Sequence, residues 1–115
     1  MSASGGRAAI PINKTFTGSE GVVNVNAGRG RIIGGQVQNT EVSAIYLVFF
    51  DALAANVTLG TTLPYYYIAV SPGDNDPIVP GGDAEIYFGT AISVACVSTP
   101  TGSTQKSCFA SILIG

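Results

Sequence analysis

Short apolar segments recur from Gly21 onward, and clusters of Gly, Pro, Ser, Thr and Asn separate them. Segments at this spacing are typical of an antiparallel β-sandwich or a jelly-roll-like barrel. The pattern predicts strands over residues 22–26, 31–39, 42–51, 57–59, 65–71, 84–88, 91–97 and 107–114. Residues 51–55 have a helical composition but are too few to form a helix alone. We expect an all-β fold of about eight short strands, with a bulge where Gly34 and Gly35 interrupt one strand.

The segment before Gly21 has a different composition. Ser, Gly and Ala dominate its first nine positions, and the isolated apolar residues Ile10, Ile12 and Phe16 follow. Pro11 favours extended backbone at the residue before it. We expect residues 1–18 to form an extended N-terminal arm that either frays or docks these side chains on a neighbouring subunit. Residues 19–115 then form a single β-sandwich domain.

The predicted strand over residues 42–51 is apolar on both faces. One face carries Val42, Ala44, Tyr46, Val48 and Phe50, and the other carries Ser43, Ile45, Leu47 and Phe49. In an antiparallel sandwich only one face of a strand meets the core. The outer face therefore needs a cover, which the arm, a loop or another subunit could supply. The low charge of the chain favours another subunit, because exposed apolar area usually marks an interaction site.

Composition and charge narrow the range of functions. The 115 residues include 46 % apolar and 10 % charged residues, with five basic and seven acidic residues and a net charge of −2. Nucleic-acid binding through phosphates needs a basic face, which this balance does not provide. The absence of histidine excludes Ser-His-Asp and Cys-His catalysis, so we expect no enzymatic activity and no cofactor. No signal peptide and no membrane-spanning run are recognisable, which indicates synthesis in the cytoplasm.

The two cysteines lie in the last two predicted strands. A hairpin around residues 100–104 would match like with like on both faces. Its pairs are Ile92 with Ile112, Val94 with Ala110, Cys96 with Cys108, Ala91 with Leu113, Ser93 with Ser111 and Ala95 with Phe109. The hairpin brings Cys96 and Cys108 together, so a disulfide is geometrically plausible. A reducing cytoplasm favours a pair of buried thiols instead.

Four exposed-type side chains are candidates for a partner interface. Arg29 and Arg31 fall on one side of their strand, where they would either pair with an acidic partner surface or remain solvated. Tyr65 and Tyr67 share one strand face. Tyrosine is enriched at protein interfaces, and two rings on one face would also suit carbohydrate stacking.

The acidic segment over residues 74–85 does not fit a helix-flanked calcium loop, and an irregular calcium site is the alternative that stays open. Asp74, Asp76 and Glu85 occupy positions 1, 3 and 12 of a calcium-loop count, but Val79 stands where the loop needs glycine. Two Pro-Gly turns explain the segment more simply. Asp83 and Glu85 are spaced like a glycosidase pair, but nothing in the sequence indicates a raised pKa for either carboxylate.

Four segments resemble a pattern found in small virion proteins of tailed bacteriophages. They are YLVFFDA (46–52), VTLGTTLP (57–64), FGTAISVA (88–95) and TPTGS (99–103), within a resemblance that covers roughly residues 30–114. The resemblance implies a head decoration (cement) protein that binds the outer capsid surface and stabilises the head. Its implied partners are the major capsid protein and copies of itself, with a trimer favoured, and the family has no catalytic residues. A tail, neck or fibre-base component and a carbohydrate-binding module are the alternatives.

Overall fold

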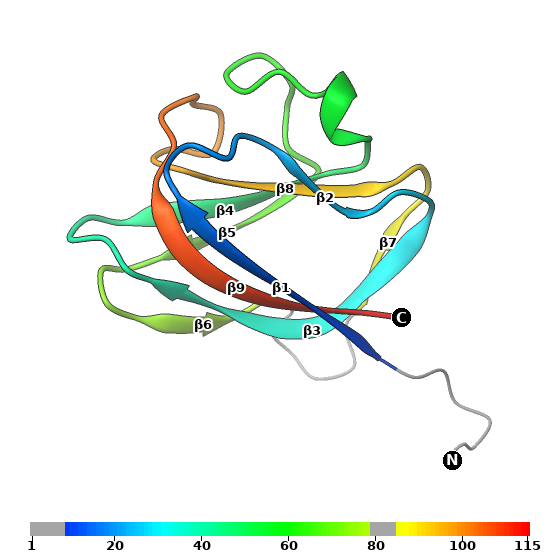
Figure 1. The fold of residues 1–115 in the computed structure, drawn as a ribbon, viewed down its shortest axis with the longest axis horizontal. Helices are drawn as coiled ribbons and strands as arrows, with labels where there is room; N and C mark the ends of the chain where they lie inside the picture. Colours follow the sequence, from blue (N-terminus) through cyan, green and yellow to red (C-terminus); the bar gives the residue numbers. More distant parts are fainter. Residues whose placement is uncertain (1–8, 79–84) are drawn as a thin grey trace.

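The computed structural model describes residues 9–78 and 85–115, and these fold as an antiparallel β-sandwich (Figure 1). Sheet I has the strand order β1-β9-β3-β6, with β7 also paired to β3, and sheet II has the order β2-β8-β4-β5. The strands are β1 (Ile10–Thr17), β2 (Val23–Asn26), β3 (Gly30–Asn39), β4 (Ile45–Phe50), β5 (Tyr66–Val70), β6 (Asn75–Pro77), β7 (Ile86–Phe88), β8 (Ile92–Val97) and β9 (Ser107–Ile114). The predicted all-β sandwich is confirmed.

The central core lies between the two sheets and follows the period-2 alternation of their strands. In β9, the even-numbered residues from Cys108 to Ile114 are buried, whereas Phe109, Ser111 and Leu113 are more exposed. In β4, Ile45, Leu47 and Phe49 face the same core. This core also holds Ile32, Val37, Val70, Ile78, Phe88, Ile92, Val94 and Ile112, all fully buried.

Residues 10–17, expected as part of an arm, form strand β1 at the edge of sheet I. The strand pairs with β9 in a continuous antiparallel register from Ile10↔Ile114 to Thr17↔Ser107. The alternation of Ile12, Lys14 and Phe16 turns these side chains toward the core, and Phe16 is 4 % exposed there. Phe16 therefore docks within its own chain and is not available to a neighbouring subunit. Residues 1–8 lie outside the described residues.

The predicted hairpin register between the last two strands is wrong. β8 belongs to sheet II and pairs with β2 and β4, whereas β9 belongs to sheet I and pairs with β1 and β3. Between them, the connection keeps only a short ladder near Val97 and Gln105. The like-with-like matching has a different cause: the inward rows of both strands, Cys96 and Cys108 included, stack across the central core.

The outer face of sheet II is covered by the chain itself over β4 and β8. Val48, Phe50, Ala95 and Val97 form a second buried group, the outer cluster, against which Val22, Tyr46, Val57 and Leu59 pack. Val57 and Leu59 belong to the loop over residues 51–64, where a strand over 57–59 was predicted. The expectation that another subunit covers β4 is therefore corrected, because the loop buries Val48 to 0 % and Phe50 to 2 %.

Polar contacts hold this loop in place. The carboxylate of Asp51 accepts a hydrogen bond from the backbone N–H of Thr90 at 2.7 Å, and the hydroxyl of Ser93 donates to the carbonyl of Ala52 at 2.7 Å. The loop contains a single 3₁₀ turn, η1 (Ala54–Asn56). Across residues 9–78 and 85–115, no helix has both the length and the apolar character that a bilayer crossing requires.

Candidate interaction surfaces

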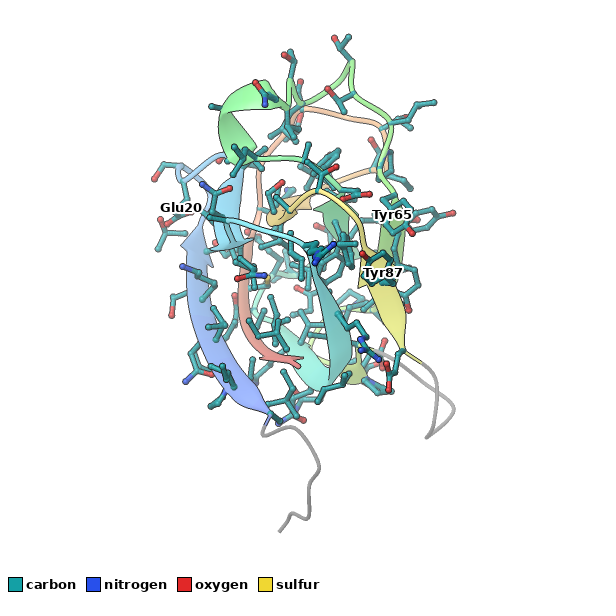
Figure 2. The ribbon with its side chains drawn as sticks, turned by 90° about the vertical axis from the view of Figure 1, so that its right-hand side faces the viewer. Glu20, Tyr65 and Tyr87 are labelled. Atoms are coloured by element: carbon teal, nitrogen blue, oxygen red, sulfur yellow. The ribbon has the colours of Figure 1, made fainter. Side chains whose placement is uncertain are left out.

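A group of exposed aromatic and aliphatic side chains gathers around β5 and β7. Leu63 is 76 % exposed, and Tyr65, Tyr67 and Tyr87 are each about half exposed. We call these four residues the tyrosine surface. Figure 2 shows Tyr65 and Tyr87 close to each other on one side of the sandwich. Large apolar groups of this kind are costly to leave in water and are enriched at interfaces.

Specific contacts hold these tyrosines in fixed positions. The hydroxyl of Tyr65 donates to the carbonyl oxygen of Tyr87 at 2.8 Å, and its ring meets Phe88 edge-on with centroids 4.9 Å apart. The ring of Tyr67 meets Tyr46 edge-on with centroids 6.0 Å apart. Binding to a surface of pre-positioned rings costs less side-chain entropy than binding to mobile ones.

The tyrosine surface borders an unprotected sheet edge. β5 pairs with β4 from Ile45↔Val70 to Phe49↔Tyr66, and no strand of the described residues pairs with its other side. Its sequence, YYIAV, contains no charge and no proline. Since the N–H of Tyr65 points to the carbonyl of Phe49, the alternate N–H groups of Tyr66 and Ile68 point away from β4.

The other sheet edges carry features that discourage pairing with another chain. β1 contains Pro11 and the inward-facing, half-buried Lys14. β2 has four residues and an irregular register, and β6 and β7 have three residues each. β5 is therefore the edge best suited to accept a strand from a partner.

Of the two arginines predicted for an interface, Arg31 already has a partner. Its Nη1 lies 2.9 Å from Oε1 of Glu85, and both side chains are about 40 % exposed, so the pair contributes little to stability. Arg31 is directly opposite Tyr87 in the β3–β7 register and extends the tyrosine surface. Arg29 is exposed in the turn before β3.

The predicted apolar contacts of the N-terminal segment divide between surface and core. Ile10 is 54 % exposed at the start of β1, and Ile12 packs against the central core. With Phe16 buried, Ile10 is the member of this group that a partner could reach. Tyr87 and Leu63 were not predicted as interface residues; Leu63 is two residues from Tyr65 in sequence, whereas only the fold brings Tyr87 to Tyr65.

The cysteines are two free thiols, buried in the central core. They come from opposite sheets and share a hydrogen bond, which together with burial raises the pKa of Cys96 above its ordinary value. The Cys96 thiol is thus protonated and poorly nucleophilic at neutral pH. This arrangement suits small core-filling side chains.

The described residues hold no group of three or more metal-ligating side chains. Asp74 directly precedes β6, Asp76 lies within it, and Asp83 is outside the described residues. Two polar residues of the described chain, Asn39 and Ser93, are fully buried, and both are hydrogen-bonded to backbone carbonyls. Because both side chains hydrogen-bond to the backbone, they stabilise the fold.

The fold defines an antiparallel β-sandwich with an exposed tyrosine surface. No protein-family model and no curated protein matches the sequence. Among solved structures, a chain from Bacillus endospore appendages, described as a novel family of disulfide-linked pili, is similar over 93 % of this chain and 83 % of its own, with 13 % identity and a TM-score of 0.45. Similarity at this level carries no argument about function.

Proposed function

We propose that this protein is a non-enzymatic structural protein of a tailed-phage virion, which decorates the outer capsid surface as a homo-oligomer. The observation that carries the proposal is the tyrosine surface beside the open edge of β5. The four strand-and-turn segments that resemble small virion proteins, quoted above, support the same assignment. Leu63 and Tyr65 belong to or directly follow one of those segments.

The proposed action is mechanical. An oligomer bound where capsid subunits meet adds contact area that resists separation of those subunits. An interface of standard size, about 1,600 Å² in total, is sufficient for each contact. Many copies over the shell then convert modest single contacts into high overall stability.

Attachment to particles tests the proposal. Purified heads that lack the protein are mixed with the wild-type chain and sedimented, and the bound copies are counted. We expect hundreds of copies per head and heads that resist heating better. A dozen copies or fewer would instead indicate a neck or tail component, and no attachment would contradict a virion role.

The tyrosine surface is tested with a matched pair of variants. Tyr67→Lys places a charge in β5, at the open sheet edge. The control, Val42→Lys, places a charge at an apolar residue that is 95 % exposed in the loop between β3 and β4. We expect Tyr67→Lys to shift the oligomer to monomer in light scattering and to reduce head attachment. Val42→Lys is expected to behave as wild type.

A further inference from the structure

The outer face of sheet I contains a groove that the proposed function does not use. Two adjoining hollows of about 410 Å³ and 140 Å³ meet there over β3, β6 and β9. Both are lined by Gln36, Asn75 and Ser111. We call this feature the amide groove; Leu113 lines one end and Gln38 and Phe109 line the other.

The larger hollow lies beside the bulge at Gly34 and Gly35 and is lined by Gly35. The β3–β9 register shifts between Ile32 and Gly34, which confirms the predicted bulge. Gly35 has a φ of +125°, and a Cβ there would collide with the carbonyl oxygen of Ser111. Because Gly35 has no side chain, the sheet surface is depressed between Gln36 and Leu113. The shape of the hollow therefore follows from the backbone conformation at Gly35.

Apart from the carboxylate of Asp76, the polar side chains of the groove both donate and accept hydrogen bonds. Gln36, Gln38 and Asn75 each carry an amide, which both donates and accepts hydrogen bonds, and Ser111 adds a hydroxyl with the same property. Gln36 and Gln38 are exposed, and the β3–β6 register places Gln38 directly opposite Asn75. A ligand rich in hydroxyl groups, which also donate and accept, matches such a lining.

Charge excludes several other ligands. Among the described lining residues there is no Lys or Arg, so phosphate and sulfate groups find no counter-ion. The carboxylate of Asp76, which lines the larger hollow, disfavours anionic ligands further. The mixture of amides, hydroxyl and apolar groups is too polar for a lipid chain.

Phe109 supplies an apolar platform at one end of the groove. It is 44 % exposed and lies directly opposite Gln38 in the β3–β9 register. The face of a sugar ring presents C–H groups, which pack on an aromatic ring while the hydroxyls at its rim reach polar side chains. The apolar face of a sugar ring can therefore pack on Phe109 while its hydroxyl groups hydrogen-bond to the neighbouring amides.

We propose that the amide groove binds a neutral oligosaccharide. Gln36, Asn75 and Ser111 hydrogen-bond its hydroxyls, and Phe109 stacks on one ring. The site is separate from the tyrosine surface, and the proposal stands whether or not the protein decorates a capsid. It also places carbohydrate recognition on sheet I rather than on Tyr65 and Tyr67.

The test begins with the full chain on an array of immobilised neutral and acidic oligosaccharides. The best neutral binder is then titrated in solution as a soluble, monovalent ligand, so that oligomerisation does not alter the result. We expect affinity about tenfold weaker for Phe109→Ala and about fivefold weaker for Gln36→Ala. Tyr67→Ala, which removes another half-exposed ring, is the matched control and keeps wild-type affinity.

A second measurement does not depend on variants. In NMR spectra of the wild-type chain, the ligand should shift the side-chain amide signals of Gln36, Gln38 and Asn75. Absence of binding to any neutral glycan overturns the proposal, as does binding that Tyr67→Ala abolishes and Phe109→Ala does not. Loss of head attachment by Phe109→Ala, with no glycan bound, would identify the groove as a protein-docking surface and also overturn it.

Discussion

The central core and the outer cluster bury similar side chains in different ways. The central core lies between two hydrogen-bonded sheets and is closed on both sides by strands. The outer cluster lies between sheet II and a loop, residues 51–64, that contains one short 3₁₀ turn. The two groups meet in β4, where Phe49 points to the first and Phe50 to the second.

The difference shows that a strand apolar on both faces does not by itself require a partner subunit. A loop of the same chain covers the outer face of β4, and Asp51 and Ser93 fix the loop by hydrogen bonds. A loop has fewer backbone bonds than a sheet and opens at lower free energy. The outer cluster should therefore be the more yielding of the two regions.

Truncation of the two adjacent phenylalanines tests this contrast most strongly. Phe49→Ala leaves a cavity beside Tyr66 and Phe88 that two sheets cannot close, and we expect a loss of about 4 kcal/mol in the free energy of unfolding. Phe50→Ala should cost about 2 kcal/mol, because the loop can settle into the space. Urea denaturation of both variants measures the difference. Equal losses would contradict the idea of a yielding loop.

A pair of glycines provides the next comparison. Gly35 (φ +125°) lies over the central core, and an added Cβ would meet backbone atoms of β9. Gly60 (φ +87°) lies in the covering loop, where an added Cβ would meet only Ser103, at 3.4 Å. We expect Gly35→Ala to lower the free energy of unfolding by about 3 kcal/mol and Gly60→Ala by about 1 kcal/mol. Thermal unfolding of both variants is the measurement, and the reverse order would contradict the contrast.

Thiol labelling at the adjacent positions 95 and 96 compares how fast the outer cluster and the central core open. In the folded wild type, Cys96 and Cys108 should label only as fast as the whole domain unfolds, and the unfolded, unreduced chain should show two free thiols. Ala95→Cys, made with Cys96→Ala and Cys108→Ala, reports on the outer cluster and should label at least about tenfold faster through loop opening. Identical rates would show that both regions open together.

The smallest expected effect is the loss of stability in acid, which acts through the carboxylates of Glu20 and Glu41. Hydrogen bonds from Thr17 lower the pKa of Glu20 to about 2, and the backbone N–H of Ser107 lowers that of Glu41 below 4.5. Both carboxylates stabilise the fold fully above the unfolded-state pKa of 4.5, and this stabilisation is lost as the pH falls toward 2. We expect the Tm to fall between pH 5 and pH 2, and Glu41→Gln to reduce that fall. Calorimetry over this range checks it, and an unchanged pH profile of Glu41→Gln would contradict it.

Pattern and turn residues predicted much of the fold. The strands around Val48, Ile68, Val94 and Ala110 and the bulge at Gly34 and Gly35 follow from local preference. β1 was missed as a sheet strand because it is the edge strand of sheet I and its few apolar residues alternate with polar ones. β6 was missed because a three-residue strand next to prolines carries no periodic signal.

Matching of side-chain types could not assign strands to sheets. β8 and β9 match residue for residue whether they lie side by side in one sheet or face each other across the core. In both arrangements their inward rows are apolar, so the sequence supports both equally. The two strands are separated because each pairs with other strands: β9 forms its backbone hydrogen bonds with β1 and β3, and β8 forms its own with β4.

The sequence alone determined the all-β class, the alternation that builds the central core and the low overall charge, because these depend on local side-chain chemistry. The tertiary structure decided which surfaces remain open. It covered Val48 and Phe50, left Tyr67 and the β5 edge uncovered, and assembled the amide groove from three separate strands. Exposure is a property of the whole packed chain, since a side chain is covered or left open by residues far from it in sequence.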